Sequence, residues 1–397
     1  MRRTPDVASL GRDYGGLTMS DPTDDRLRVL VVGGGPGAVE GALALQALAG
    51  ERAVITLVSR ERTLDYHPLA VNEPFGFGPP VRYDLAALAK ERWLNFVHGE
   101  VTGVDAPMRR IELADGDVLP YDGLLLAIGA RAREAIPGAV TFRGGPDVPT
   151  VRRALAALRR HEPIRVAFVA GAETAWTLPL YELALLTVRW AQGEELALEP
   201  WLVTHEPRVL AAFGPGASAD ISELLDDAGV KLWTGAYAED VDDGRLWLSM
   251  EGGMPVDLAV ALPKPEGRRL AGLPCDEQGF VPVAADGAVD GLPGVYAVGD
   301  MTSRPLKQGG LATQQADVAA AAIARAAGAA VADLPYEPVL RGVLLTGGRP
   351  RYLRHAVGDA GAAGGEPMWW PPHKIAARHL APYLATHPQL RVGEAVP

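Results

Sequence analysis

The sequence predicts an α/β fold made of two Rossmann-like dinucleotide-binding domains, the second inserted in the first, followed by a C-terminal cap. From residue 27 onward, apolar strands alternate with longer helical patterns, which is typical of βαβ units stacked around parallel sheets. One series of such units begins near residue 27 and a second near residue 150. A glycine-rich turn follows the first strand, at the point where dinucleotide-binding folds carry theirs.

Composition limits the classes of function. The chain has 397 residues, enough for two or three domains, with 48% hydrophobic and 22% charged residues. The formal net charge of −11 argues against a nucleic-acid partner, because phosphate backbones bind basic surfaces. A single cysteine excludes an internal disulfide and a cysteine-only metal site, and the eight histidines show no metal-ligand spacing. We expect no metal, no membrane-spanning segment and a cytoplasmic location.

The composition and the strand pattern divide the chain into five segments. Residues 1–26 are expected to be a disordered N-terminal tail without a convincing signal peptide. Residues 27–149 and 281–330 are predicted to form the two parts of the first domain, and 150–280 the inserted second domain. Residues 331–397 differ in composition and are predicted to form the cap or an interface region.

Each domain is expected to repeat the order strand, helix, strand. In the first, we expect strand Leu27–Val32, a helix from about Gly37 to Ala49, strand Ala53–Val58, a hairpin-like meander over Val101–Leu119 and strand Gly123–Ile128. In the second, we expect helix Val151–His161 with Thr150 as its cap, strand Ile164–Ala170, helix Trp176–Ala191 and strand Ala197–Thr204. Strand Gly294–Val298 is expected to return to the first sheet, before helix Leu311–Ala327.

The first strand is followed by a dinucleotide-binding loop, a G-x-G-x-x-A match. Gly33 permits the tight turn, Gly35 lets a pyrophosphate approach the backbone, and Ala38 is small enough for the helix to pack on the strand. The next strand ends at Ser59, Arg60 and Glu61. Glu61 is the candidate ribose-binding carboxylate, although it comes two residues late and is equally well interpreted as a solvated surface acid.

Three motifs then show a resemblance to a family. Gly33–Ala38, Asp122–Ala130 and Gly294–Asp300 resemble the three FAD motifs of flavoproteins with two dinucleotide-binding domains, the pyridine nucleotide-disulfide oxidoreductase-like superfamily. Within it, Tyr66–Leu69 and Lys307–Ala316 are similar to the branch of type II NADH dehydrogenases and sulfide:quinone oxidoreductases. The resemblance covers about residues 27–330 and implies that the first domain binds FAD.

The resemblance also implies which residues contact the flavin. Asp300 would bond a ribityl or pyrophosphate-side hydroxyl, Val101 the adenine, and the helix starting near Leu311 would direct its N-terminus at the ring. The full expected FAD set is Gly33, Gly35, Gly37, Ala38, Ser59, Arg60, Glu61, Val101, Ala127, Gly129, Gly299, Asp300, Gly310 and Leu311. His67 is the candidate for proton handling, with a structural histidine as the alternative. Lys307 is either a cation of the flavin pocket or a surface lysine. Lys374 resembles a basic residue that this branch places near the flavin.

The second domain lacks an intact nicotinamide loop. Gly171 holds the first glycine position, but Glu173 and Trp176 stand at the second and third. A carboxylate there repels a pyrophosphate, and an indole replaces a small packing residue. Glu206, after the next strand, is expected to lie mostly at the surface. We therefore expect no NAD(P)H binding of the usual kind.

The single cysteine argues against two other activities. Sulfide:quinone oxidoreductase chemistry needs at least two cysteines, and a disulfide reductase needs a cysteine pair. Cys275, which the segment limits place in the second domain, is expected to be an incidental thiol.

The cap contains Trp369-Trp370 and the amphipathic stretch Ile375–Leu384, broken near Pro382. The two tryptophans are expected to wall an acceptor pocket, to anchor at a membrane interface, or to form a dimer or interdomain contact.

The leading hypothesis is an FAD-dependent oxidoreductase that exchanges electrons between a donor other than NAD(P)H and an acceptor such as a quinone. The first alternative is an NADH:acceptor oxidoreductase with an unusual nicotinamide pose. The second is a flavin-scaffolded protein whose binding surface responds to redox state. The expected partners are small-molecule donors and acceptors, with peripheral membrane contact through the cap or a homodimer as further options.

Overall fold

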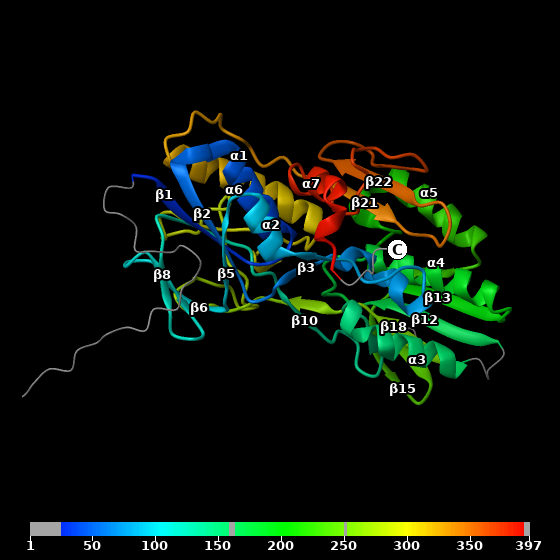
Figure 1. Ribbon diagram of the computed structural model, residues 1–397. Helices are drawn as coiled ribbons and strands as arrows, with labels where there is room; N and C mark the ends of the chain where they lie inside the picture. The colour runs from blue at the N-terminus through cyan, green and yellow to red at the C-terminus, as the bar shows by residue number, and fades with distance from the viewer. Residues whose placement is uncertain (1–24, 159–162, 250–251, 393–397) are drawn as a thin grey trace, which may run out of the picture.

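The computed structural model describes residues 25–158, 163–249 and 252–392 and contains two separate parallel sheets joined by two strands (Figure 1). The predicted two-sheet α/β class is therefore confirmed. The tail predicted over residues 1–26 lies, apart from its last two residues, outside the described part of the chain.

The first sheet has five parallel strands in the order β20-β9-β1-β2-β5. Their bounds are β20 Val295–Ala297, β9 Gly123–Leu126, β1 Leu27–Val32, β2 Ala53–Ser59 and β5 Asn95–His98. Because β20 pairs in parallel with β9, the predicted return of the chain to this sheet is confirmed. The strands are nearly all apolar because both faces of the sheet are covered.

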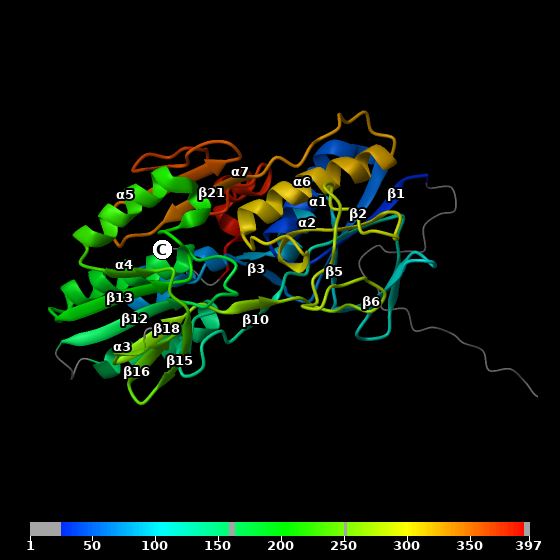
Figure 2. The same ribbon diagram turned by 180° about the vertical axis from the view of Figure 1, so that it is seen from behind.

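Two helices lie side by side on one face of this sheet, as both ribbon views show (Figures 1 and 2). They are α1, Pro36–Ala49, and α6, Gly309–Ala326. Small side chains let them approach: a Cβ placed on Gly41 would lie 3.6 Å from the Cβ of Ala316. α6 begins two residues before the predicted start at Leu311, because the Gln308 side chain caps it by accepting from the Leu311 N–H (2.7 Å).

The second sheet also has five parallel strands, in the order β11-β18-β12-β13-β14. Their bounds are β11 Val140–Thr141, β18 Leu258–Ala261, β12 Ile164–Ala170, β13 Leu198–Thr204 and β14 Lys231–Thr234. The helices are α3 Val148–Leu158, α4 Leu178–Gly193 and α5 Gly214–Asp227. Thr150 is not the cap of α3, because the helix begins two residues earlier; residues 159–161 of the predicted helix lie outside the described part.

Two antiparallel strands carry the chain between the sheets: β10, Arg131–Arg133, and β19, Lys264–Glu266 (Figure 2). β11 pairs with β18 before the predicted domain limit at residue 150. After β19 the chain is already beside the first sheet, because Ala271 bridges Gly103 and Val281 bridges Thr302. Cys275 therefore lies with the first unit and not, as predicted, in the second. We propose the crossing strands as the domain limits.

The remaining strands form small antiparallel sheets. Their bounds are β3 Thr63–Asp65, β4 Arg82–Asp84, β6 Val101–Asp105, β7 Arg110–Leu113, β8 Val118–Pro120, β15 Ala238–Asp242, β16 Arg245–Leu248 and β17 Gly252–Pro255. Helix α2 covers Leu85–Glu91, and short 3₁₀ helices cover Gly50–Arg52, His67–Phe75, Gly145–Asp147, Ala211–Phe213, Gly299–Met301 and Pro388–Leu390. The predicted meander corresponds to β6, β7 and β8.

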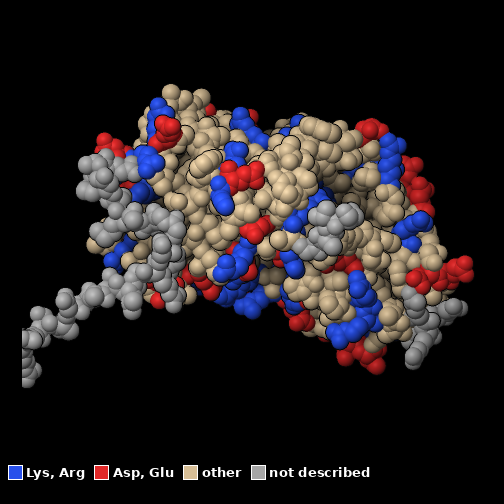
Figure 3. Space-filling model, in the orientation of Figure 1, with Lys and Arg blue, Asp and Glu red and all other residues tan. Residues whose placement is uncertain are grey.

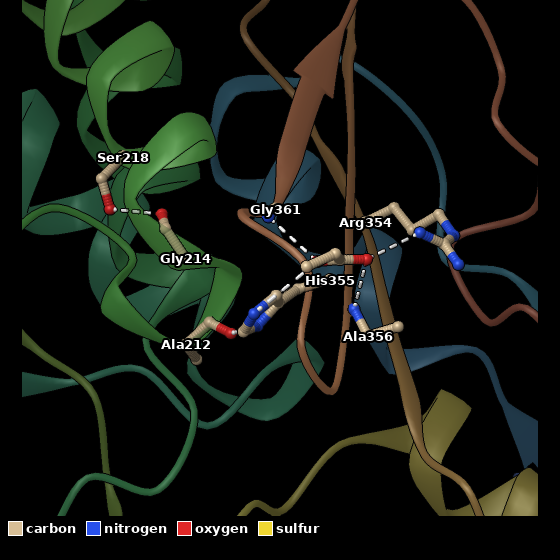
Figure 4. Close-up of polar contacts among 8 residues, drawn as sticks. Ala212, Gly214, Ser218, Arg354, His355, Ala356 and Gly361 are labelled. Atoms are coloured by element: carbon tan, nitrogen blue, oxygen red, sulfur yellow. Dashed lines mark hydrogen bonds and ion pairs between the residues drawn. The ribbon is translucent and has the colours of Figure 1, made fainter.

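The C-terminal region adds a three-stranded sheet that lies against the second unit near α4 and α5 (Figures 1 and 2). It consists of β21 Val339–Leu344, β22 Arg351–Ala356 and β23 Ala362–Gly364. His355 Nδ1 lies 2.7 Å from the carbonyl oxygen of Ala212, next to the start of α5 (Figure 4). Gly361 is required here, because it has φ +74° and a Cβ would lie 1.7 Å from the Phe213 oxygen.

The last helix, α7, Leu380–Thr386, is shorter than the predicted amphipathic stretch and contains Pro382 in its first turn, where proline is tolerated. Its start is held by Glu40 of α1, whose carboxylate accepts from the N–H groups of Arg378, His379 and Leu380 at 2.6–2.8 Å. Within the described ranges, no helix combines the length and the apolar character that crossing a membrane requires.

Candidate functional site

The larger cavity, about 570 Å³, opens at the carboxyl ends of β1, β2 and β9. This is the edge where open α/β sheets bind their ligands. Of the sequence-predicted residues, it is lined by Gly33, Gly35, Gly37, Ser59, Arg60, Glu61, His67, Val101, Ala127, Gly129, Gly299 and Asp300. The fold thus brings together residues from distant parts of the chain: Gly33 and Asp300, which both line this cavity, are 267 positions apart.

The glycines of the first loop have different roles. Gly33 has φ +136°, and a Cβ there would lie 2.3 Å from the carbonyl oxygen of Ala127, so only glycine fits between β1 and β9. At Gly35 a Cβ would meet no atom within 4 Å, although this residue lines the cavity. The space in front of Gly35 is what a diphosphate approaching the backbone requires. Ala38 does not line the cavity; it packs beneath Gly33, as predicted from its size.

The end of β2 contributes a buried hydroxyl and exposed charges. Ser59 is 2% exposed, and its Oγ accepts from the Glu61 N–H at 3.1 Å. The Glu61 carboxylate pairs with Arg60 Nε at 3.2 Å and keeps 62% of its side chain exposed. Glu61 therefore lies at the rim of the cavity, in reach of a ligand and of solvent.

Two residues of α6 that were expected to contact FAD, Gly310 and Leu311, do not line either cavity, and their contact with FAD stays a prediction. Gly309 and Ala312 line the larger cavity instead. The reason is the earlier start of the helix, which turns Leu311 into the core at 5% exposure and engages its N–H with Gln308.

Three arginines that carry no sequence motif also line the larger cavity: Arg131 of β10, and Arg268 and Arg269 after β19. Burial lowers the pKa of Arg268, and the positive charges of Arg60 and Arg131 lower it further. The buried Arg268 Nε has no hydrogen-bond partner among the described residues. Crowded cations with an unsatisfied donor fit an anionic ligand such as a diphosphate. The pairing of β10 with β19 brings these arginines to the larger cavity. No sequence motif around them indicates this position.

A smaller cavity of about 430 Å³ adjoins the first, and His67, Arg131, Asp300 and Gly309 line both. Burial raises the pKa of Asp300, and the charge of Lys307 opposes that shift. Burial lowers the pKa of Lys307 to about 8, although Asp300 opposes this. Lys307 donates to the Thr302 carbonyl, and its Nζ lies 3.8 Å from the centre of the Phe280 ring. The predicted Lys307 is thus a cavity residue.

Lys374 lines the smaller cavity within a buried ion pair. Its Nζ lies 2.5 Å from Glu182 Oε1 of α4 and donates to the Pro68 carbonyl at 2.8 Å. The side chains are 7% and 0% exposed. Burial lowers the pKa of Lys374 and raises that of Glu182, while their attraction opposes both shifts. The pair joins the cap, α4 and the segment after Tyr66.

The second loop has lost the form of a phosphate cradle. Glu173 pairs with Lys264 at 2.7 Å, and α4 begins at Leu178, two residues after the predicted start. The Trp176 ring lies 5.7 Å from that of the buried Phe213. β21 approaches this cluster so closely that a Cβ on Gly342 would lie 2.8 Å from Phe213 and 3.2 Å from Leu178.

The prediction that Glu206 lies mostly at the surface is wrong, because the residue is only 6% exposed. Its Oε2 accepts from the Tyr181 hydroxyl (2.7 Å) and from Thr204 Oγ1 (3.1 Å), and its Oε1 from the Ala211 N–H (3.0 Å). Both oxygens therefore bind donors of the protein itself. In intact dinucleotide-binding sites, a carboxylate at the end of the second strand of the βαβ unit binds a ribose hydroxyl. Here the carboxylate that follows β13, Glu206, is already bound to the protein's own donors.

Three side chains outside the cavities, Glu40, Asp317 and His379, have ligand atoms within 4.8 Å of one another. Glu40 already accepts three backbone hydrogen bonds with its two oxygens. Burial and the neighbouring Glu40 raise the pKa of Asp317 to about 8. The cluster therefore fits a proton shared by two carboxyl groups.

Comparisons with known proteins give a family match, related sequences and a similar fold. A family model described as pyridine nucleotide-disulphide oxidoreductase matches residues 27–326. The ferredoxin–NAD(+) reductase subunit of the benzene 1,2-dioxygenase system of Pseudomonas putida is 30% identical, over 71% of this chain and 68% of the relative. An NADH dehydrogenase-like protein of Mycobacterium tuberculosis is 28% identical, over 70% and 73%.

Among solved structures, the sulfide:quinone oxidoreductase of Aquifex aeolicus superposes with a TM-score of 0.76. It is 16% identical, and the match covers 85% of this chain and 87% of that one. At this identity the likeness concerns the fold.

Proposed function

Because this chain belongs to the pyridine nucleotide-disulphide oxidoreductase family, a family of FAD-dependent oxidoreductases, we propose that it exchanges electrons between a donor other than NAD(P)H and an acceptor such as a quinone. The acceptor class follows the resemblance of Tyr66–Leu69 and Lys307–Ala316 to the quinone-linked branch. The donor and the acceptor are small molecules, and the donor is the one that uses the smaller cavity.

The larger cavity is proposed to hold FAD. The loop at Gly33–Gly37 would hold the diphosphate, with Arg60, Arg131 and Arg268 supplying positive charge. Asp300 and Gly299 would lie beneath the middle of the cofactor, and His67 at the junction of the two cavities. When bound there, FAD supplies the electron exchange. His67 and Lys307 are the proposed proton-handling groups, since each lines the junction or the smaller cavity.

The observation that carries the choice of donor is the altered second loop, where Glu173 and Trp176 stand in place of two glycines. The indole of Trp176 packs against the ring of Phe213, and β21 comes close to Phe213 and Leu178. Glu206, the remaining acid of the usual ribose position, has both oxygens engaged. A dinucleotide would have to displace these contacts and approach the Glu173 carboxylate.

The test is an anaerobic titration of the purified flavoprotein with NADH, followed by the oxidised-flavin absorption band. No change is expected, while dithionite should still remove the band. Prompt loss of the band with NADH would contradict the proposal. A Trp176→Gly, Glu173→Gly variant is the matched experiment, because it restores both missing glycines: any response to NADH should increase there.

A second candidate is an NADH:acceptor oxidoreductase. It is favoured by the names of the two relatives above, both of which refer to NAD(+) or NADH. It predicts fast loss of the flavin band with NADH and steady turnover with a quinone, so the same titration decides between the two functions.

A further inference from the structure

Much of the lining of the smaller cavity is apolar. The apolar lining residues are Phe142, Trp176, Leu178 and Leu262, together with Val71 and the prolines 68, 179, 263 and 265. Trp176 is held in place by its contact with Phe213. Rings and prolines lose little conformational freedom when a ligand binds, so this lining favours a flat apolar group.

The charged side chains that line the same cavity are mostly positive. The set is Arg131, Arg143, Lys264, Lys307 and Lys374, against Asp300 and Glu182. Lys374 and Glu182 neutralise each other in their buried ion pair. Among the described residues, Asp300 is therefore the one lining acid that remains to offset four cations, one of which, Arg131, also lines the larger cavity.

The acids that pair with these cations lie outside the cavity. Lys264 pairs with Glu173 at 2.7 Å, and Arg143 with Asp147 at 3.0 Å. Neither acid lines the cavity, whereas both cations do. Both pairs are partly exposed to solvent, where an ion pair is weak and an additional anion competes readily. On the face shown in Figure 3, Lys and Arg side chains gather at the junction between the two units.

The helix geometry adds to this charge. α4 has 16 residues and begins at Leu178, which lines the cavity together with Pro179. Thr177 does not cap the helix with its side chain. The N-terminus of a helix carries a partial positive charge, so α4 increases the positive potential that the four cations create.

We propose that the smaller cavity binds a small aromatic acid, with its ring against Trp176 and Phe142 and its carboxylate near Lys264 and Arg143. This inference rests on the proposed function, in which the smaller cavity receives a donor other than NAD(P)H, and it names the chemical class of that donor. The volume of about 430 Å³ accommodates a small ring system, and the cations select an organic anion over a neutral molecule of equal shape.

The test is isothermal titration calorimetry of the FAD-loaded protein with two probes of the same shape, naphthalene-2-carboxylate and naphthalene-2-carboxamide. We expect the acid to bind roughly tenfold more tightly than the amide at low salt, since it adds a charge-assisted contact. The difference should shrink at high salt. Equal affinity for both probes, or binding of neither, would overturn the proposal.

Three variants make the test specific. Lys264→Met should reduce the affinity for the acid about tenfold and leave that for the amide unchanged. Glu173→Gln should raise the affinity for the acid, because it removes the competing carboxylate. Lys231→Met is the matched control: Lys231 is also a partly exposed lysine paired with an acid, Glu199, but lines neither cavity. An equal loss in Lys231→Met would contradict the assignment.

The outcome is separable from that of the proposed function. Loss of the flavin band with NADH would reject the proposed donor class whatever the probes do. If NADH is inert and the acid is not preferred, the substrate class alone is wrong.

Discussion

The change of Gly35 to alanine tests whether the first loop approaches a diphosphate. Gly35 has φ −88° and ψ −179°, which any residue adopts, and a Cβ there meets no atom within 4 Å. An alanine at this helix cap costs up to about 1 kcal/mol, and the loss of glycine from the unfolded chain returns about 0.4–1 kcal/mol. The free energy of unfolding of the FAD-free protein should therefore stay within about 0.5 kcal/mol of the original.

The effect of Gly35→Ala on FAD should be larger. The added methyl group enters the cavity where the diphosphate is proposed to meet the backbone. A lost charge-assisted hydrogen bond is worth about 1.5–3 kcal/mol, so the affinity for FAD should fall roughly 10- to 100-fold. FAD fluorescence quenching measures the affinity, and urea unfolding of the FAD-free protein measures the stability.

Gly33→Ala is the contrasting variant. Its Cβ would lie 2.3 Å from the Ala127 oxygen at a φ of +136°, so stability and FAD binding should both fall, with a backbone strain of about 1–3 kcal/mol. If Gly35→Ala bound FAD with unchanged affinity, the loop would not contact the cofactor at Gly35, and the proposed position of the diphosphate would be wrong.

Three further predictions follow from the same structure. Asp300→Ala should yield protein with a reduced flavin content, read from the ratio of flavin to protein absorption; full retention of FAD would contradict its placement beneath the cofactor. Lys374→Met should destabilise the protein by roughly 3–5 kcal/mol in urea unfolding, because it leaves Glu182 buried without its partner, whereas the double change with Glu182→Met should recover most of the loss. Asp317, with a pKa raised to about 8, stays protonated in the folded state while it ionises in the unfolded chain, so stability should fall as the pH rises from about 4 to 8. Asp317→Asn should flatten that dependence, and an unchanged slope would show that another group causes it.

The elements with strong local patterns were predicted closely. β1 and β12 match their predicted bounds, because an apolar run ending in a glycine turn is visible in consecutive residues. Helix starts were less accurate, with α3, α4 and α6 beginning two or three residues from their predicted positions. A helix start depends on which side chain caps it, as Gln308 does by accepting from the Leu311 N–H. Several neighbouring residues could act as the cap, so the sequence does not fix the first helical residue.

Residues whose roles depend on distant partners were missed or misplaced. Glu206 was expected at the surface, but Tyr181 and Ala211 supply donors that make its burial favourable. Arg268 carries no local signal, and it reaches the larger cavity because β19 pairs with β10 more than 130 residues earlier. Glu182 and Lys374 lie 192 residues apart and form one ion pair.

The sequence by itself determined the two-sheet α/β class, the glycine loop at Gly33–Gly37 and the damage to the second loop at Glu173 and Trp176, since each depends on residues adjacent in the chain. Only the tertiary structure decided that Trp176 packs on Phe213, that the cap closes against α4 through Lys374, and that a second, cation-lined cavity adjoins the first. Contacts of this kind form when the whole chain buries its apolar surface, and their free energy depends on which distant segments that burial brings together.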